Sequence, residues 1–130
     1  PISFVNADAL MGELQGKGEN ILFSQTVPSY DDFYSKEAVE YLKNLTFYYP
    51  EEKPSLVSYE SYLAAKSVVT ALKAINGAIT PSKFLDKLKN ISPRTLDNIP
   101  LEYNHAQLLN QVYLSNYVNG KFEIIQKYEY

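Results

Sequence analysis

An Asn119-Gly120 pair near the end of the chain constrains the fold more than any other feature of the sequence. Both residue types tolerate positive φ, so the pair favours a two-residue turn between antiparallel strands. The flanking segments, Val112–Val118 and Lys121–Gln126, alternate apolar and polar residues, as strands with one buried face do. The sequence therefore predicts a closing β-hairpin, which a short strand at Leu101–Tyr103 is expected to precede.

The first thirty residues predict a strand, a helix and a second strand. The segment Ile2–Val5 is apolar, and Asp8 stands just after it, where a helix begins. The second strand, Asn20–Val27, is mostly apolar and stops at Pro28, which has no N–H to donate to a sheet. Two strands joined by a helix favour a parallel βαβ unit with a right-handed connection.

Three helices are predicted in the middle of the chain. The first follows the cap candidates Asp31-Asp32 and runs to about Leu45. The second begins after Ser58 and runs to about Asn76, and the third starts at Thr80-Pro81, where Thr is the N-cap and Pro the first helical residue. The spacing of apolar residues predicts three core-facing stripes: Phe33, Ala38, Tyr41, Leu42 and Leu45; Tyr62, Ala65, Val69 and Leu72; Phe84, Leu85 and Leu88.

The composition excludes several classes of function. The formal net charge of -3, without a dense block of Lys and Arg, argues against a nucleic-acid-binding protein. The chain has no cysteine, which excludes disulfides, thiolate metal sites and cysteine nucleophiles. No apolar run approaches the roughly 20 residues that a transmembrane helix needs. The chain starts at Pro1 without an initiator Met, and we expect it to be a piece of a longer protein.

Four segments stand in an order that is typical of one protein family. They are Phe4–Leu10 (FVNADAL), Gly18–Pro28 (GENILFSQTVP), Pro54–Ala65 (PSLVSYESYLAA), and the closing strands Leu101–Tyr103 with Val112–Ile125. In this order they resemble the C-terminal portion of the type I periplasmic binding proteins, in the branched-chain amino-acid-binding group. The resemblance implies an α/β fold, with a βαβ unit, three further helices and a closing hairpin. Because members of this family are far longer, the N-terminal portion is expected to be missing.

The resemblance also implies two lobes that close on a solute. Residues 1–28 and about 99–130 would belong to the second lobe, and residues from about 29 to 98 to the first. The implied function is reversible binding of a small polar solute, an amino acid, for an ABC transporter in the periplasm. No cofactor is implied. The implied partners are this solute, a membrane transporter or a fused receptor module, the missing N-terminal portion, and a second copy of the chain.

Asp8 is the first candidate for a ligand contact. The resemblance places it in the turn where a carboxylate of the family can meet the ammonium group of the solute, as a charge-assisted acceptor. The alternative is that Asp8 only begins a helix, where a carboxylate favours the cap and the dipole.

Ser58, Tyr59 and Glu60 are the second set of candidates. The free N–H groups of a helix N-terminus, together with the hydroxyl of Ser58, can hold the carboxylate of a solute, and Tyr59 can form an apolar wall. The alternative is that Ser58 only caps the helix and that Glu60 only complements its dipole.

The sequence shows no catalytic or metal site. His105 is the only histidine, and its neighbours supply neither a nucleophile nor further metal ligands. Phosphate-binding glycine patterns and nucleophile elbows are absent, so we expect a protein that is not an enzyme. Two alternative functions stay open: the ligand-sensing extracytoplasmic domain of a membrane signal-transduction receptor, and a protein-interaction domain that docks through its 12 tyrosines.

Overall fold

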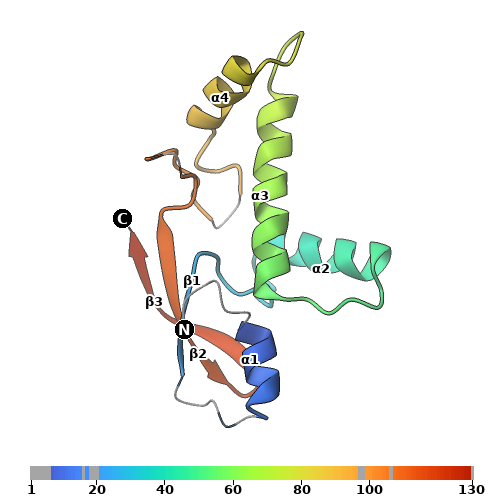
Figure 1. Cartoon of the computed structure of the whole chain (residues 1–130), viewed down its shortest axis with the longest axis vertical. Coiled ribbons are helices and arrows are strands. Elements are labelled where there is room, and N and C mark those ends of the chain that lie inside the picture. The colour runs from blue at the N-terminus through green and yellow to red at the C-terminus, as the bar shows by residue number, and fades with distance from the viewer. Residues whose placement is uncertain (1–6, 16, 18–20, 97–98, 106, 130) are drawn as a thin grey trace.

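The fold is mixed α/β, as the sequence predicts. The computed structural model describes residues 7–15, 17, 21–96, 99–105 and 107–129, and in these it contains four helices and one three-stranded sheet (Figure 1). The predicted strand Ile2–Val5 lies outside the described residues, and so does the parallel pairing expected of the βαβ unit. None of the helices in the described residues has the length and hydropathy of a membrane span.

The sheet has the order β1-β2-β3 and is antiparallel throughout. β1 (Leu22–Gln25) pairs with β2 (Gln111–Val118), and β2 pairs with β3 (Lys121–Glu129). The turn between β2 and β3 is Asn119-Gly120, with φ of 51° and 82°. Positive φ at both positions matches the twist of the flanking strands, so the predicted hairpin is confirmed.

One face of the sheet carries part of the hydrophobic core. Phe23 of β1 and Phe122 of β3 meet edge to face, with ring centroids 5.3 Å apart. Tyr113 and Ser115 of β2 are buried on the same face, because alternate residues of a strand share a side. Met11 of α1 (Ala7–Glu13) belongs to the same cluster of buried residues.

α2 (Lys36–Tyr48) begins later in the chain than the sequence predicts. Its N-cap is Ser35, whose hydroxyl accepts a hydrogen bond from Ala38 N at 3.4 Å. The cap predicted at Asp31-Asp32 is wrong, because the Asp32 carboxylate instead accepts from Tyr34 N at 3.0 Å in a local turn. Phe33 therefore lies outside the helix and is 70% exposed, so its predicted place in the core is wrong too.

α3 (Leu56–Lys73) starts before the predicted first residue. Ser55 is its N-cap and forms a capping box with Ser58, which is the third helical residue and not the cap. The helix ends at Lys73, and Gly77, with φ of 76°, lies in the turn that follows. The predicted end at about Asn76 is three residues late.

The buried stripe of α3 differs from the predicted one. The helix buries Leu56, Tyr59, Leu63, Ser67 and Ala71. Of the predicted stripe, Ala65 and Val69 are exposed, and Val57 and Val68 on the same side are exposed as well. The sequence of α3 is apolar on two faces, and periodicity alone cannot tell which of them a neighbouring segment covers.

α4 (Pro81–Lys89) confirms the predicted start, since Thr80 Oγ1 accepts from Lys83 N at 3.4 Å and Pro81 is the first helical residue. Its predicted core face is only half-buried at Phe84, and Leu85 is exposed. This helix lies against the upper end of α3 in Figure 1.

The predicted strand Leu101–Tyr103 is wrong. Leu101 is buried, but the backbone there belongs to a loop in which Glu102 N donates to Leu108 O and Asn104 pairs with Gln107. Leu101 fills the core whereas Glu102 beside it is exposed, and the backbone N–H groups of these two residues bond to Pro93 O and Leu108 O and not to the sheet. The Leu101 side chain joins a core that also includes Val27, Leu63 and Leu96.

Candidate functional site

The Asp8 carboxylate joins three segments that are far apart in the sequence. Its Oδ1 accepts a hydrogen bond from Tyr30 Oη at 2.9 Å, and its Oδ2 accepts from Leu56 N at 3.0 Å. Leu56 is the first residue of α3, and its N–H has no partner inside the helix. Asp8 therefore stands at the positive end of α3, and in Figure 1 α1 lies just below the lower end of α3.

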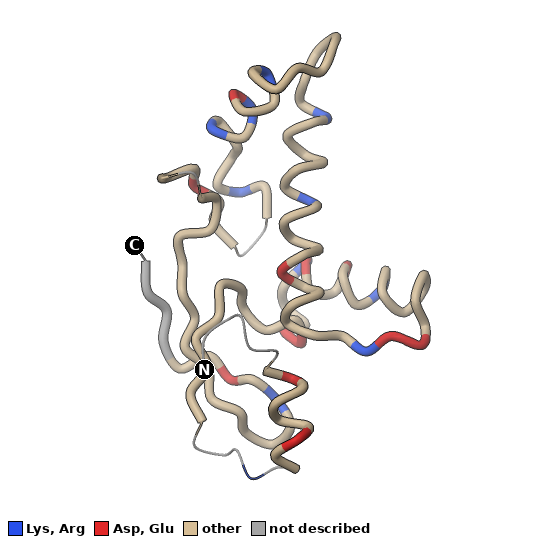
Figure 2. Tube along the Cα trace, viewed as in Figure 1, with Lys and Arg blue, Asp and Glu red and all other residues tan. Residues whose placement is uncertain are grey.

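A cavity of about 750 Å³ opens beside Asp8. Its other lining residues come from α1, from the segment after β1 and from the loop between α2 and α3: Ala9, Tyr30, Glu51, Glu52, Lys53, Pro54 and Ser55. The charged side chains of the lining are three carboxylates and one lysine, and the charges of the loop are visible in Figure 2. The carboxylates of the lining can therefore accept hydrogen bonds from a cationic group, and the lysine can bind an anionic group.

Tyr30 is held at this cavity as a permanent hydrogen-bond donor. Its ring is half-buried and lies 6.3 Å from the ring of Tyr41, centroid to centroid. Burial raises the pKa of the Tyr30 phenol well above its usual range, and the negative charge of Asp8 raises it further. The hydroxyl therefore keeps its proton and donates a hydrogen bond to Asp8 at any physiological pH.

The predicted candidate Ser58 is used inside the protein. Its Oγ lies 2.5 Å from Tyr41 Oη and 3.0 Å from Ser55 Oγ, and it donates to Ser55 O at 3.1 Å. Ser58 lines a different cavity, of about 330 Å³, between α2 and α3. The structure therefore does not bring Ser58 to the cavity of Asp8.

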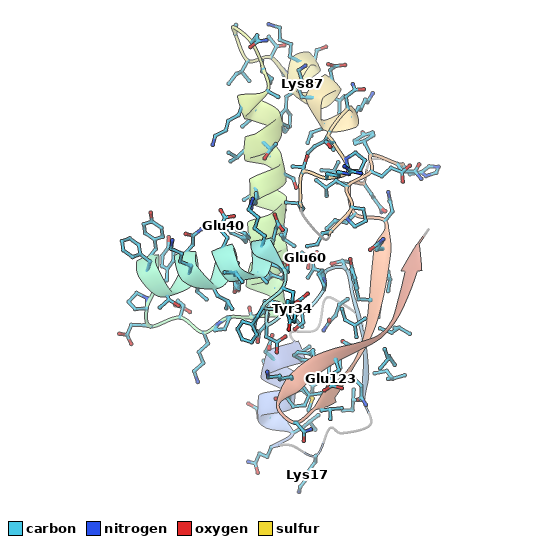
Figure 3. The ribbon with its side chains drawn as sticks, turned by 180° about the vertical axis from the view of Figure 1, so that it is seen from behind. Lys17, Tyr34, Glu40, Glu60, Lys87 and Glu123 are labelled. Carbon is cyan, nitrogen blue, oxygen red and sulfur yellow. The ribbon has the colours of Figure 1, made fainter. Side chains whose placement is uncertain are left out.

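Tyr59 and Glu60 are not brought to that cavity either. Tyr59 is fully buried in the core, where its ring lies 5.1 Å from that of Tyr41, and burial raises the pKa of its phenol to about 12. Glu60 is half-buried near the beginning of α3, as Figure 3 shows.

Sequence reasoning missed two residues at the site, Tyr30 and Ser55. Nothing in the sequence distinguishes Tyr30 from the other tyrosines, because its role depends on Asp8, which is 22 residues away. Ser55 carried a signal: a serine directly after a proline and three residues before a second serine is a typical helix start.

A separate charged cluster ties α2 to α3. Lys66 Nζ lies 2.6 Å from Glu40 Oε2 and 3.4 Å from Glu37 Oε1, and the Glu37 side chain is almost fully buried. This cluster is a structural one, because it holds two helices together. No group of three or more metal-ligating side chains occurs in the described part of the chain, and His105 lies in an exposed turn.

Two solved structures are similar to this chain. One is a possible leucine/isoleucine/valine-binding protein from Rhodopirellula baltica SH 1, with 27% sequence identity and a TM-score of 0.82 over 96% of this chain and 34% of that one. The other is an extracellular ligand-binding receptor from Verminephrobacter eiseniae ef01-2, with 17% identity and a TM-score of 0.78 over 94% of this chain and 36% of that one. The sequence matches no family model, and no curated protein matches it significantly. The chain thus spans about a third of the length of each similar structure.

Proposed function

We propose that this chain, which has the fold of a segment of a type I periplasmic binding protein, takes part in binding an amino acid outside the cytoplasm. The fold is the one that the sequence predicts, and both similar structures are of ligand-binding proteins. The observation that carries the proposal is the position of Asp8, whose carboxylate lines a cavity at the positive end of α3.

The charges of the cavity suit a zwitterionic solute. A desolvated ammonium group needs a charge-assisted acceptor, and Asp8 is fixed in place to supply one. Lys53, the only cation of the lining, is the proposed partner for the carboxylate of the solute. Binding is reversible and involves no covalent step.

The cavity also fits the proposed division into lobes. Residues 1–28 and about 99–130 form one lobe in this proposal, and residues from about 29 to 98 form the other. Asp8 then belongs to one lobe, and Lys53 and Leu56 to the other. A solute that contacts both lobes stabilises the closed form over the open form, which is the energetic basis of hinge closure.

Delivery of the solute to an ABC transporter in the periplasm is the proposed biological role. The alternative is a sensor domain in which closure signals across the membrane. Because the chain spans only about a third of each similar structure, the site needs the N-terminal portion of the fold to be complete. The transporter or receptor module, that portion and a second copy of the chain are the proposed partners.

A protein-interaction domain is a second candidate, favoured by an exposed aromatic group at the end of α2. Phe47, Tyr48 and Tyr49 are all exposed, and Tyr48 and Tyr49 line the cavity between α2 and α3. Exposed aromatic clusters are common at protein interfaces. Light scattering would separate the two candidates, because a docking module associates with a protein and ignores small solutes.

A thermal-shift screen of the twenty amino acids against the intact protein tests the proposed function. A solute present at 100 times its Kd stabilises the folded form by about 2.7 kcal/mol, which raises the melting temperature by several degrees. At least one amino acid should do so. If none of them shifts the melting temperature, the protein does not bind this class of solute.

A further inference from the structure

The Asp8 carboxylate is oriented by two donors from outside its own helix. Tyr30 Oη and Leu56 N each bond one of its oxygens, at 2.9 Å and 3.0 Å. A carboxylate offers about four acceptor positions, so roughly two remain for a further donor. Asp8 also lines the cavity, where such a donor would come from the solute.

The two donors differ in how firmly they are held. The Leu56 N–H is part of the backbone of α3, whose first turn is fixed by the Ser55 capping box. The Tyr30 hydroxyl is a side-chain donor, and its position depends on the packing of its ring against the core and near Tyr41. Removing the Tyr30 hydroxyl alone would leave Asp8 one fixed contact, about which the carboxylate can turn.

We propose that Tyr30 is a positioning residue for solute recognition, which holds the Asp8 carboxylate in the orientation that accepts the ammonium group of the solute. This inference rests on the proposed function. Tyr30 needs no contact with the solute for this role. A preoriented acceptor loses less conformational freedom when the solute binds, so its hydrogen bond contributes more to affinity.

Tyr30→Phe is the test, because it removes one hydroxyl and keeps the ring in the core. The matched control is Tyr34→Phe, which removes the hydroxyl of a tyrosine that is 94% exposed (Figure 3). The probes are L-leucine and 4-methylpentanoate, which has the same carboxylate and side chain but no amino group or other donor at the neighbouring carbon. Calorimetry on the intact protein measures Kd for each.

We expect Tyr30→Phe to weaken L-leucine binding roughly fivefold to tenfold, as the loss of one hydrogen bond does, and to leave the affinity for 4-methylpentanoate unchanged. Tyr34→Phe should bind both probes as the unmodified protein does. An unchanged Kd for L-leucine in Tyr30→Phe would overturn the proposal, and so would an equal loss for both probes, because the effect would then not concern the amino group.

A measurement without solute separates this inference from the proposed function. The χ1 rotamer populations of Asp8, from side-chain coupling constants, should show one dominant rotamer in the unmodified protein and averaging in Tyr30→Phe. Equal populations in the two proteins would refute the positioning role whether or not L-leucine binds. If the χ1 rotamers of Asp8 are averaged in the variant but the unmodified protein binds no amino acid, Tyr30 orients Asp8. Tyr30 then has no part in solute recognition, and that part of the proposal is refuted.

Discussion

The Asp8 carboxylate and the backbone N–H of Leu56 are 3.0 Å apart, although 48 residues separate them in the chain. The contact places a negative charge at the positive end of α3, from a residue that belongs to α1. Asp8 was predicted from the sequence either to contact the solute or to begin its own helix. Asp8 lies in the first turn of α1, as the second of these expectations has it, and its side chain also reaches α3 and lines the cavity.

Ser55→Ala should destabilise the protein through the start of α3. The Ser55 hydroxyl accepts from Ser58 N at 3.2 Å, and replacing such a cap by alanine costs about 1 kcal/mol. Urea unfolding measures this cost as a lower midpoint. Ser61→Ala is the control within the same helix, because the Ser61 hydroxyl is exposed and bonds only to Val57 O. Equal midpoints for the two variants would show that the cap does not contribute.

Leu63→Ala and Val68→Ala should separate the two apolar faces of α3. Leu63 is fully buried, so its truncation removes core contacts and leaves a cavity, at a cost of roughly 2–5 kcal/mol. Val68 is 39% exposed, and its truncation should change the unfolding free energy of this 130-residue chain by less than about 0.5 kcal/mol. A larger loss for Val68→Ala than for Leu63→Ala would mean that the other face of α3 is the buried one.

Lys66→Met should weaken the contact between α2 and α3. The substitution leaves the almost fully buried Glu37 without its cation, and since Lys66 is partly exposed we expect a loss of about 1–2 kcal/mol. Lys43→Met, on the exposed side of α2, is the control and should be nearly neutral. Chemical unfolding of the two variants side by side gives the difference, and a neutral Lys66→Met would contradict the role of the cluster.

Stability should fall at alkaline pH because of buried tyrosines. Burial raises the pKa of Tyr59 to about 12, whereas in the unfolded chain it is about 10. The folded form therefore keeps a proton that the unfolded form loses, so the stabilising contribution is complete below pH 10 and disappears as the pH rises towards 12. Urea midpoints between pH 8 and pH 11 test this. In Tyr59→Phe the urea midpoint should fall less over this pH range than in the unmodified protein. An equal fall in the two proteins would mean that groups other than Tyr59 cause it.

The sequence predicts the parts of the fold that depend on local chemistry. The Asn119-Gly120 turn depends only on two neighbouring residues that tolerate positive φ, and the start of α4 depends only on Thr80 and Pro81. The structure confirms both predictions. The predicted start of α2 is wrong because the sequence offers two good caps, Asp32 and Ser35, close together. In the fold it is Ser35, which is buried, that caps the helix.

The parts that depend on distant contacts are the ones that the sequence could not predict. The exposed stripe of α3 has the same periodicity as a buried one, and the segment Leu101–Tyr103 has the alternation of a strand without being one. For the site, Asp8 could be named from the sequence, whereas Tyr30 could not, because only the folded chain brings its hydroxyl to the carboxylate.

Calorimetry of Asp8→Asn in the intact protein tests the central claim most directly. The substitution removes the negative charge with little change of shape, and Glu13→Gln, an exposed change in α1, is the control. With the amino acid that gives the largest thermal shift, Asp8→Asn should raise Kd more than tenfold, and Glu13→Gln should leave it unchanged. A Kd for Asp8→Asn equal to that of the unmodified protein would contradict the account, because Asp8 would then not be the acceptor of the amino group.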